Sequence, residues 1–296
     1  MNESIHRYFR IGALQWMSYP KDKALDSLYR VAADPFFDAV EFSGCESRED
    51  RSRARRIIAE SHISAAIGAQ PRLLAGKLNP NAIEEAEREK AEKVLLDAVD
   101  EASDIGAEGL SFLSGRYTRE TKEACFDALV ITTKNVCRYA QERGLQVELE
   151  LFDYDVDKCS LIGPVDFAAR FAGEIRKDCP NFGLLLDLSH LPIMHEETEH
   201  AVCVLRPYLT HFHIGNAVMK PGYPSYGDKH PRFGFPNSEN DTAELVRFFR
   251  ALKNEGFFQE DRPYMLSTEI TPQGDEDPVL VMAGAKRVIN RAWAMV

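Results

Sequence analysis

Residues 182–190 read FGLLLDLSH, and residues 209–216 read LTHFHIGN. Each stretch is an apolar run that carries ionisable side chains at its end: Asp187 and His190 in the first, His211 and His213 in the second. Apolar runs of this kind are normally buried strands. An ionisable group on a buried strand costs several kcal/mol unless it is paired or bound to a metal. The two stretches therefore predict buried strands whose ends form a functional site.

Similar apolar runs recur along the chain and alternate with amphipathic segments of helical length. The strand-like runs are Arg10–Trp16, Phe37–Ser43, Ile63–Ala69, Gly109–Leu113, Gln146–Phe152, Gly183–Leu188, Thr210–Ile214 and Tyr264–Ile270. The amphipathic segments are Lys21–Ala33, Arg48–Ser61, Asn81–Ile105, Arg119–Arg143, Val165–Lys177, Glu196–Leu205, Ser238–Asn254 and Pro278–Ala294. Eight such units predict an α/β fold, a (β/α)8 TIM barrel that forms a single domain over residues 1–296. A doubly wound open sheet is the alternative, but residues 13–20, ALQWMSYP, lack the Gly-rich phosphate turn usual after its first strand.

Two connecting segments carry signals of their own. Asn79-Pro80 predicts the N-terminus of a helix, with Pro at its first position. Gly215–Asn237 is the longest irregular segment and contains Asp228, His230 and Arg232. Long loops in compact domains are usually functional or mobile, so we interpret this one as a lid or substrate-binding loop.

Composition restricts the class of partner. The 296-residue chain is 44% hydrophobic and 28% charged, with a formal net charge of −11. This charge disfavours nucleic acid as a partner, because phosphate contacts need clustered Lys and Arg. The six cysteines include no CxxC pair, and the polar N-terminus lacks an apolar leader. We therefore expect a cytoplasmic protein with reduced thiols, no membrane association and a small-molecule substrate.

Four consecutive strands each end in a potential metal ligand. Glu150 lies in VELELFD, Asp187 and His213 lie in the stretches quoted above, and Glu269 lies in YMLSTEITP. The carboxyl ends of barrel strands converge on one mouth. Carboxylates with one imidazole suit a single divalent ion; Mn²⁺ is our first choice, with Mg²⁺, Co²⁺ and Zn²⁺ as alternatives. The alternative is a set of buried ion pairs without metal, in which three carboxylates would repel one another.

The two-residue period of a strand assigns further positions. Glu148 and Glu150 share one face of their strand, as His211 and His213 do, and the C-terminal member of each pair lies nearer the mouth. Glu148 and His211 should therefore lie deeper, as supporting or packing groups. Glu41 is expected only to end its strand. Trp16 is a candidate for an apolar wall against a sugar, with core packing as the alternative.

These residues resemble the xylose isomerase-like TIM-barrel superfamily, which includes sugar phosphate isomerases, epimerases and apurinic endonucleases. The resemblance rests on the strand-ending Glu of ELELFD, the D-x-x-H of LLLDLSHLP, the H-x-H of THFHIGN and the final Glu of LSTEI. It implies that Glu150, Asp187, His213 and Glu269 bind one metal ion. It also implies that Glu150 and Glu269 transfer protons and that His190 contacts substrate.

The loop that contains Asp228 and His230 resembles loops found in two branches of the superfamily. The endonuclease branch also needs histidines at the ends of strands three and four, where this chain has Gln70 and Ser114. The α subunit of C-glycoside deglycosidases has a similar loop and works with a small β subunit. That resemblance implies that Asp228 and His230 act on substrate, and Arg232 is a candidate substrate contact in the same loop.

The expected reaction is proton abstraction next to a metal-chelated carbonyl, which gives an enediolate. Reprotonation makes the enzyme a sugar or keto-sugar isomerase or epimerase, the reading we favour, with a homo-oligomer as the expected assembly. Expulsion of an aryl carbon makes it a carbon–carbon lyase on 3-keto C-glycosides, with the β subunit as partner. The chain contains no GxSxG, P-loop or GxGxxG motif, so acyl transfer, nucleotide hydrolysis and dinucleotide chemistry have no support.

Overall fold

The computed structural model describes residues 3–45 and 47–296, which form a closed barrel of eight parallel strands. Residues 1, 2 and 46 lie outside the described residues. Each strand pairs with the next along the chain, and β8 returns to β1, where Phe9 lies opposite Tyr264. The strands are β1 (Phe9–Leu14), β2 (Ala39–Phe42), β3 (Ser64–Gly68), β4 (Gly109–Leu113), β5 (Gln146–Glu150), β6 (Phe182–Asp187), β7 (Leu209–Gly215) and β8 (Tyr264–Glu269). The predicted (β/α)8 barrel is confirmed.

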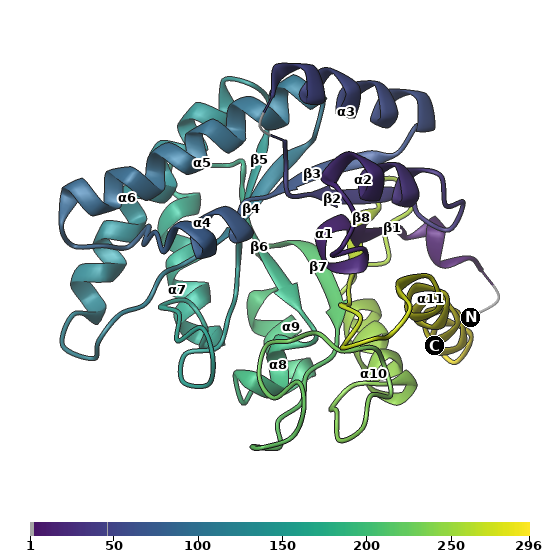
Figure 1. Ribbon diagram of the computed structural model, residues 1–296. Coiled ribbons are helices and arrows are strands. Elements are labelled where there is room, and N and C mark those ends of the chain that lie inside the picture. The colour runs from purple at the N-terminus through teal and green to yellow at the C-terminus, as the bar shows by residue number, and fades with distance from the viewer. Residues whose placement is uncertain (1–2, 46) are drawn as a thin grey trace.

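Helices surround the strands on all sides (Figure 1). The longer ones are α2 (Ala24–Ala32), α3 (Arg48–Ser61), α5 (Glu85–Ile105), α6 (Lys122–Gln141), α7 (Val165–Arg176), α9 (Thr198–Leu205), α10 (Thr242–Asn254) and α11 (Pro278–Ala294). Short helices lie in the connections: η1 (Ile5–Arg7), α1 (Gln15–Ser18), α4 (Gln70–Gly76) and α8 (His190–Ile193). None of the helices in the described part of the chain is long and apolar enough to cross a membrane.

Several of the sequence-based boundaries need correction, and the helix predicted from Ser238 begins at Thr242. The helix predicted from Asn81 begins at Glu85, so Asn79-Pro80 is not its N-terminus. The side-chain amides of Asn79 and Asn81 both donate to the carbonyl of Arg116, 3.0 Å away, and these bonds hold the segment as a loop against the end of β4. The first strand ends at Leu14, and Trp16 lies on the unpredicted helix α1. A local pattern cannot anticipate these long-range bonds and short connecting helices.

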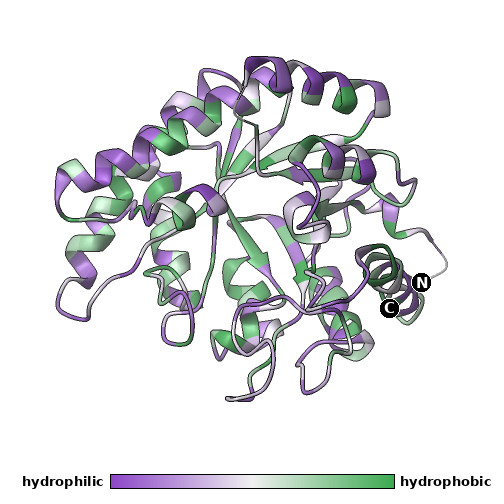
Figure 2. Ribbon diagram, viewed as in Figure 1, coloured by the Kyte–Doolittle hydropathy of each residue, from purple (hydrophilic) through white to green (hydrophobic). Residues whose placement is uncertain are grey.

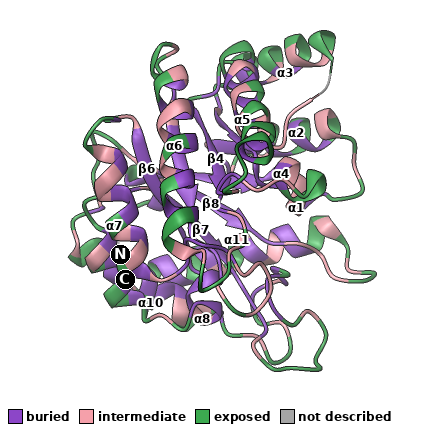
Figure 3. Cartoon of the chain, turned by 90° about the vertical axis from the view of Figure 1, so that its left-hand side faces the viewer, coloured by how far each residue is buried: buried purple, intermediate pink, exposed green. Residues whose placement is uncertain are grey.

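The apolar core lies between the strands and the helices. Phe212 on β7 points outward, and its ring packs edge-on against Phe248 of α10. Figure 2 shows β6 as mainly hydrophobic, β7 as alternating between hydrophobic and hydrophilic residues, and the outer helix α3 as mainly hydrophilic. Figure 3 shows the same strands as buried. Burying one such large apolar side chain contributes roughly 1.5–3 kcal/mol. This outer layer makes a rigid frame, which leaves the barrel interior free for polar groups.

Candidate metal centre

The four predicted ligands converge at the carboxyl ends of β5 to β8. Glu150, Asp187, His213 and Glu269 each offer one ligand atom, and these atoms all lie within 4.8 Å of one another. All four side chains are buried. Their convergence follows from the parallel register, in which Asp187 lies opposite His213 across β6 and β7. The structure therefore places together the group that the sequence selected.

His213 is the central residue of the cluster. Its Nδ1 lies 2.7 Å from Oε2 of Glu269 and 3.3 Å from Oε1 of Glu150. Its Nε2 lies 2.7 Å from Oε1 of Glu41 on β2. With Nε2 bonded to a carboxylate, Nδ1 is the nitrogen that faces the other ligands. This is the arrangement in which a carboxylate orients a metal-binding imidazole.

Glu41 is therefore more than the end of a strand, and that expectation was wrong. The side chain is fully buried and interacts with both histidines of β7, because His211 Nε2 lies 3.1 Å from the same oxygen. The only signal in the sequence was an ionisable residue at the end of an apolar run. The deeper pair lies where the two-residue period predicts: His211 Nδ1 is 2.7 Å from Oε2 of Glu148.

The electrostatics of the cluster favour a cation. Burial raises the pKa of Glu269 to about 7, and the Glu150 carboxylate adds to this shift. Burial alone would lower the pKa of His213, but the carboxylates of Glu41 and Glu269 outweigh it and raise that pKa well above the usual range. Oε1 of Glu150 is buried and has no hydrogen-bond partner among the described residues. Three carboxylates and one imidazole, with one carboxylate oxygen that accepts no hydrogen bond from the described residues, fit a hard or borderline divalent ion.

Neighbouring residues hold two of the ligands in place. The amide of Gln70 donates to Oε2 of Glu150 over 2.7 Å, and the backbone N–H of Ser189 donates to Asp187 over 2.8 Å. Gln70 and Ser114 stand at the two places where the endonuclease branch has histidines. The hydroxyl of Ser114 accepts the backbone N–H of Ile162 over 2.8 Å. Gln70 thus positions the Glu150 carboxylate, and Ser114 holds the backbone at Ile162.

A second network extends from the cluster toward the mouth. Two histidines contact Oδ1 of Asp228. The distance from this oxygen to Nε2 of His190 is 3.2 Å, and the distance to Nε2 of His230 is 2.5 Å. Burial raises the pKa of a lone carboxyl, but here His230 and His190 outweigh it and hold the pKa of Asp228 well below its usual range. The ammonium of Lys158 donates to the other oxygen of Asp228. The sequence reasoning missed Lys158, since it stands in an irregular loop with no motif around it.

A cavity of about 190 Å³ opens beside these groups. Glu150 and Glu269 line it, whereas Asp187 and His213 are fully buried behind them. The other charged or polar residues that line it are Gln70, Lys158, Asp228 and His230. The apolar residues that line it are Leu14, Trp16, Met17, Pro71, Leu74 and Phe152.

The remaining candidate residues are placed as follows. Trp16 lines the cavity. His190 is buried next to Asp228, and its Nδ1 lies 2.7 Å from the carbonyl of Leu151. The guanidinium of Arg232 is paired with Glu276, with Nε 2.8 Å from Oε1, and the residue is not among those that line the cavity. The structure thus brings the candidates together, apart from Arg232.

The sequence profile of the family described as "Xylose isomerase-like TIM barrel" matches residues 30–282, and the chain belongs to this family. Its structure is similar to that of an L-ribulose 3-epimerase, with a TM-score of 0.74 at 18% identity over 97% of this chain and 95% of that one. For the 3-keto-D-glucoside 4-epimerase of E. coli the TM-score is 0.69 at 16% identity, over 97% and 99% of the two chains. For an AP endonuclease of family 2 from Brucella melitensis the TM-score is 0.70 at 18% identity, over 93% of this chain and 96% of that one. No curated protein matches the chain.

Proposed function

We propose that the protein is a divalent-metal-dependent isomerase or epimerase that acts on a sugar or keto-sugar. The observation that carries this proposal is that two of the four clustered residues line the cavity and the other two do not. Asp187 and His213 are inaccessible behind the cavity, whereas Glu150 and Glu269 are both cluster members and cavity walls. A carboxylate in this position can reach a bound substrate as well as a metal ion.

In this proposal Glu150, Asp187, His213 and Glu269 hold one divalent ion, with Mn²⁺ our first choice. The bound ion supplies Lewis acidity, which acidifies the proton on the carbon next to a sugar carbonyl. Glu150 or Glu269 removes that proton, and the other returns one, so that an enediolate lies between the two steps. Gln70 keeps Glu150 oriented for this transfer through its 2.7 Å hydrogen bond.

In this proposal the polar residues that line the cavity orient the sugar. Asp228 and His230 line the cavity, and His190 supports Asp228 from behind. Hydroxyl groups of a sugar can replace or extend these hydrogen bonds, and Trp16 offers a flat apolar face to the ring. We leave Arg232 out of the substrate-binding set because Glu276 occupies its guanidinium.

A second candidate function is the metal-binding subunit of a C-glycoside deglycosidase. The apolar residues that line the cavity, among them Leu14 and Phe152, favour this function because they can accept an aryl group attached to the sugar. The first steps would be the same, but the intermediate would expel the aryl carbon instead of taking back a proton at the sugar. This reading also calls for a small partner subunit.

The deciding experiment combines elemental analysis with two sets of substrates. One set consists of free ketoses and 3-keto-glucosides; the other consists of 3-keto C-glycosides, offered with and without a candidate β subunit. About one metal per chain together with sugar interconversion supports the epimerase. Aglycone release that depends on the partner supports the lyase. Purified protein that binds no divalent metal contradicts both.

A further inference from the structure

A larger cavity lies at the opposite end of the barrel. It has a volume of about 600 Å³ and is lined by the first residues of four strands, Gly109, Gln146, Leu209 and Tyr264. This is the amino-terminal face, whereas the metal centre is at the carboxyl-terminal face. In TIM barrels the catalytic groups come from the latter, so this second cavity needs a separate explanation.

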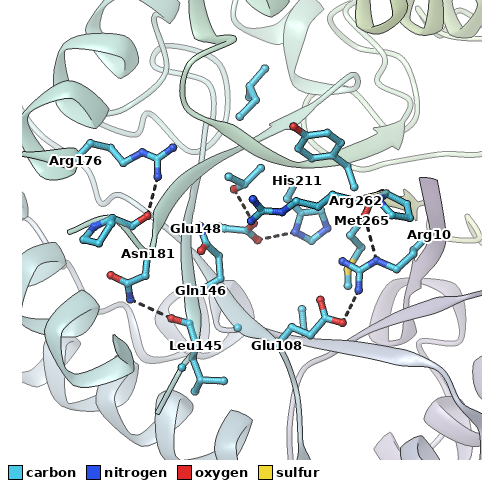
Figure 4. Close-up of a pocket in the computed structure, with 18 of the residues that line it drawn as sticks. Arg10, Glu108, Leu145, Gln146, Glu148, Arg176, Asn181, His211, Arg262 and Met265 are labelled. Atoms are coloured by element: carbon cyan, nitrogen blue, oxygen red, sulfur yellow. Dashed lines mark hydrogen bonds and ion pairs between the residues drawn. The ribbon is translucent and has the colours of Figure 1, made fainter. Parts of the chain in front are cut away.

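Four arginines line this cavity, although the chain has 36 basic and 47 acidic residues. They come from distant parts of the sequence: Arg10 on β1, Arg176 at the end of α7, Arg206 after α9, and Arg262 just before β8. Figure 4 shows Arg10, Arg176 and Arg262 around the cavity, with Glu148 and His211 between them. A concentration of positive charge in an acidic protein can be balanced by local carboxylates or by a bound anion.

Local carboxylates balance only part of the charge. Arg10 is paired with Glu108, and Arg206 Nε lies 3.7 Å from Oε2 of Glu255. The two glutamates that line the cavity are themselves engaged: Glu108 by Arg10, and Glu148 by the hydroxyl of Thr210 and by His211. They are therefore not free partners for a further guanidinium.

Arg176 and Arg262 are the two arginines of the cavity that are not paired with a carboxylate among the described residues. The contacts of Arg176 are backbone carbonyls, Pro180 O at 2.7 Å and Pro207 O at 3.4 Å, which fix the side chain but leave its charge uncompensated. Arg262 is exposed and has no ion pair or hydrogen bond within the described part of the chain. The amide of Gln146 also lines the cavity without a side-chain hydrogen bond among the described residues. The uncompensated charges of these two guanidinium groups, together with the amide, are suited to a phosphate-type oxyanion.

We propose that this amino-terminal cavity, with Arg176 and Arg262, is a binding site for a small phosphate-type oxyanion, free or as the phosphoryl group of a metabolite. The cavity volume lies within the range of about 300–1,000 Å³ that small-molecule sites occupy. The ligand lies on the face away from the metal centre, so the site is an accessory site and takes no part in the chemistry there. Its existence does not depend on the proposed function.

The test is a titration of the purified, metal-containing protein with inorganic phosphate by isothermal calorimetry. The double variant Arg176→Ala/Arg262→Ala is expected to bind phosphate about tenfold more weakly, or worse, because it lacks both guanidinium groups. The matched control is Arg247→Ala/Arg250→Ala, which removes two exposed arginines of α10 outside the cavity and changes the net charge equally. The control should bind phosphate like the unmodified protein.

Two results would overturn the proposal: no saturable phosphate binding by the unmodified protein, or undiminished binding by Arg176→Ala/Arg262→Ala. Loss of binding in Glu150→Gln with full retention in the arginine variant would place the anion at the metal centre and would equally contradict it. Titration with a hexose 6-phosphate then separates the two sources of the ligand. Tighter binding than inorganic phosphate identifies a phosphoester, and weaker binding identifies a free oxyanion. In either case both arginines are required.

Discussion

Oε1 of Glu41 lies 2.7 Å from Nε2 of His213, and this contact turns the other nitrogen of the imidazole toward the metal-ligand cluster. The carboxylate comes from β2, which donates no member of the four-residue cluster. It is one link of a chain that also includes His211 and Glu148, so polar groups run along the barrel interior below the cluster.

Replacing Glu41 by Gln should weaken metal binding by roughly 10- to 100-fold, because the imidazole loses the carboxylate that orients it and raises its basicity. A chelator-competition titration measures the dissociation constant. The control is Glu108→Gln at the other end of the barrel, where the carboxylate is exposed and paired with Arg10. Equal metal affinity in both variants would show that Glu41 does not act through His213.

Glu150→Gln and Glu269→Gln should each weaken metal binding and lower turnover by about 10²- to 10⁴-fold, the usual contribution of general acid–base catalysis. The fold should remain intact, since Gln has nearly the same volume. Metal content, turnover and circular dichroism are the measurements, with the exposed Glu239→Gln as the control. Near-normal activity in either cluster variant would rule out the proposed site.

Metal affinity should rise with pH through about 7. Burial raises the pKa of Glu269 to about 7, and nearby carboxylates raise that of His213, so a binding ion must displace protons from the pair. Below pH 7 each displaced proton weakens the apparent affinity about tenfold per pH unit. Calorimetry in buffers of different ionisation enthalpy counts the protons. Glu269→Gln should release fewer of them, and an equal count would contradict the assignment.

Lys158→Met should destabilise the protein by about 1–3 kcal/mol, because the buried Asp228 loses a charged hydrogen-bond donor. The matched control is Lys229→Met, where an exposed lysine pairs with Asp157 at 3.1 Å. Such a surface pair contributes under about 1 kcal/mol. Denaturant unfolding gives both free energies. If the two variants were equally stable, the Lys158–Asp228 pair would have no special role.

His230→Ala should leave the metal content unchanged and lower turnover, because His230 lines the cavity and bonds to Asp228 but is not one of the four clustered ligands. Elemental analysis and a turnover assay measure the two effects. His195→Ala is the control, since His195 is exposed and pairs with Asp155 outside the cavity. Unchanged activity in His230→Ala would assign His230 a structural role, and loss of metal would make it a ligand.

The barrel and its principal cluster could be predicted because both depend on local periodicity. Alternating apolar runs and amphipathic segments determine parallel strands, and the two-residue period puts His211 and His213 on the inner face while Phe212 packs outward. Parallel strands also end at one mouth, so Glu150, Asp187, His213 and Glu269 had to converge. The end of β1 and the start of α5 were misjudged, since short helices and long-range amide bonds decide them.

The sequence by itself therefore determined the fold and selected four residues that the structure brings together. Only the tertiary structure decided which groups support them. Glu41, Gln70 and Lys158 stand on a different strand, a short helix and an irregular loop, and their local sequence does not show which groups they contact. The same holds for Arg176 and Arg262, which are 86 positions apart and share one cavity. Closure of the barrel brings these side chains together, and their roles depend on distances and burial that no local pattern encodes.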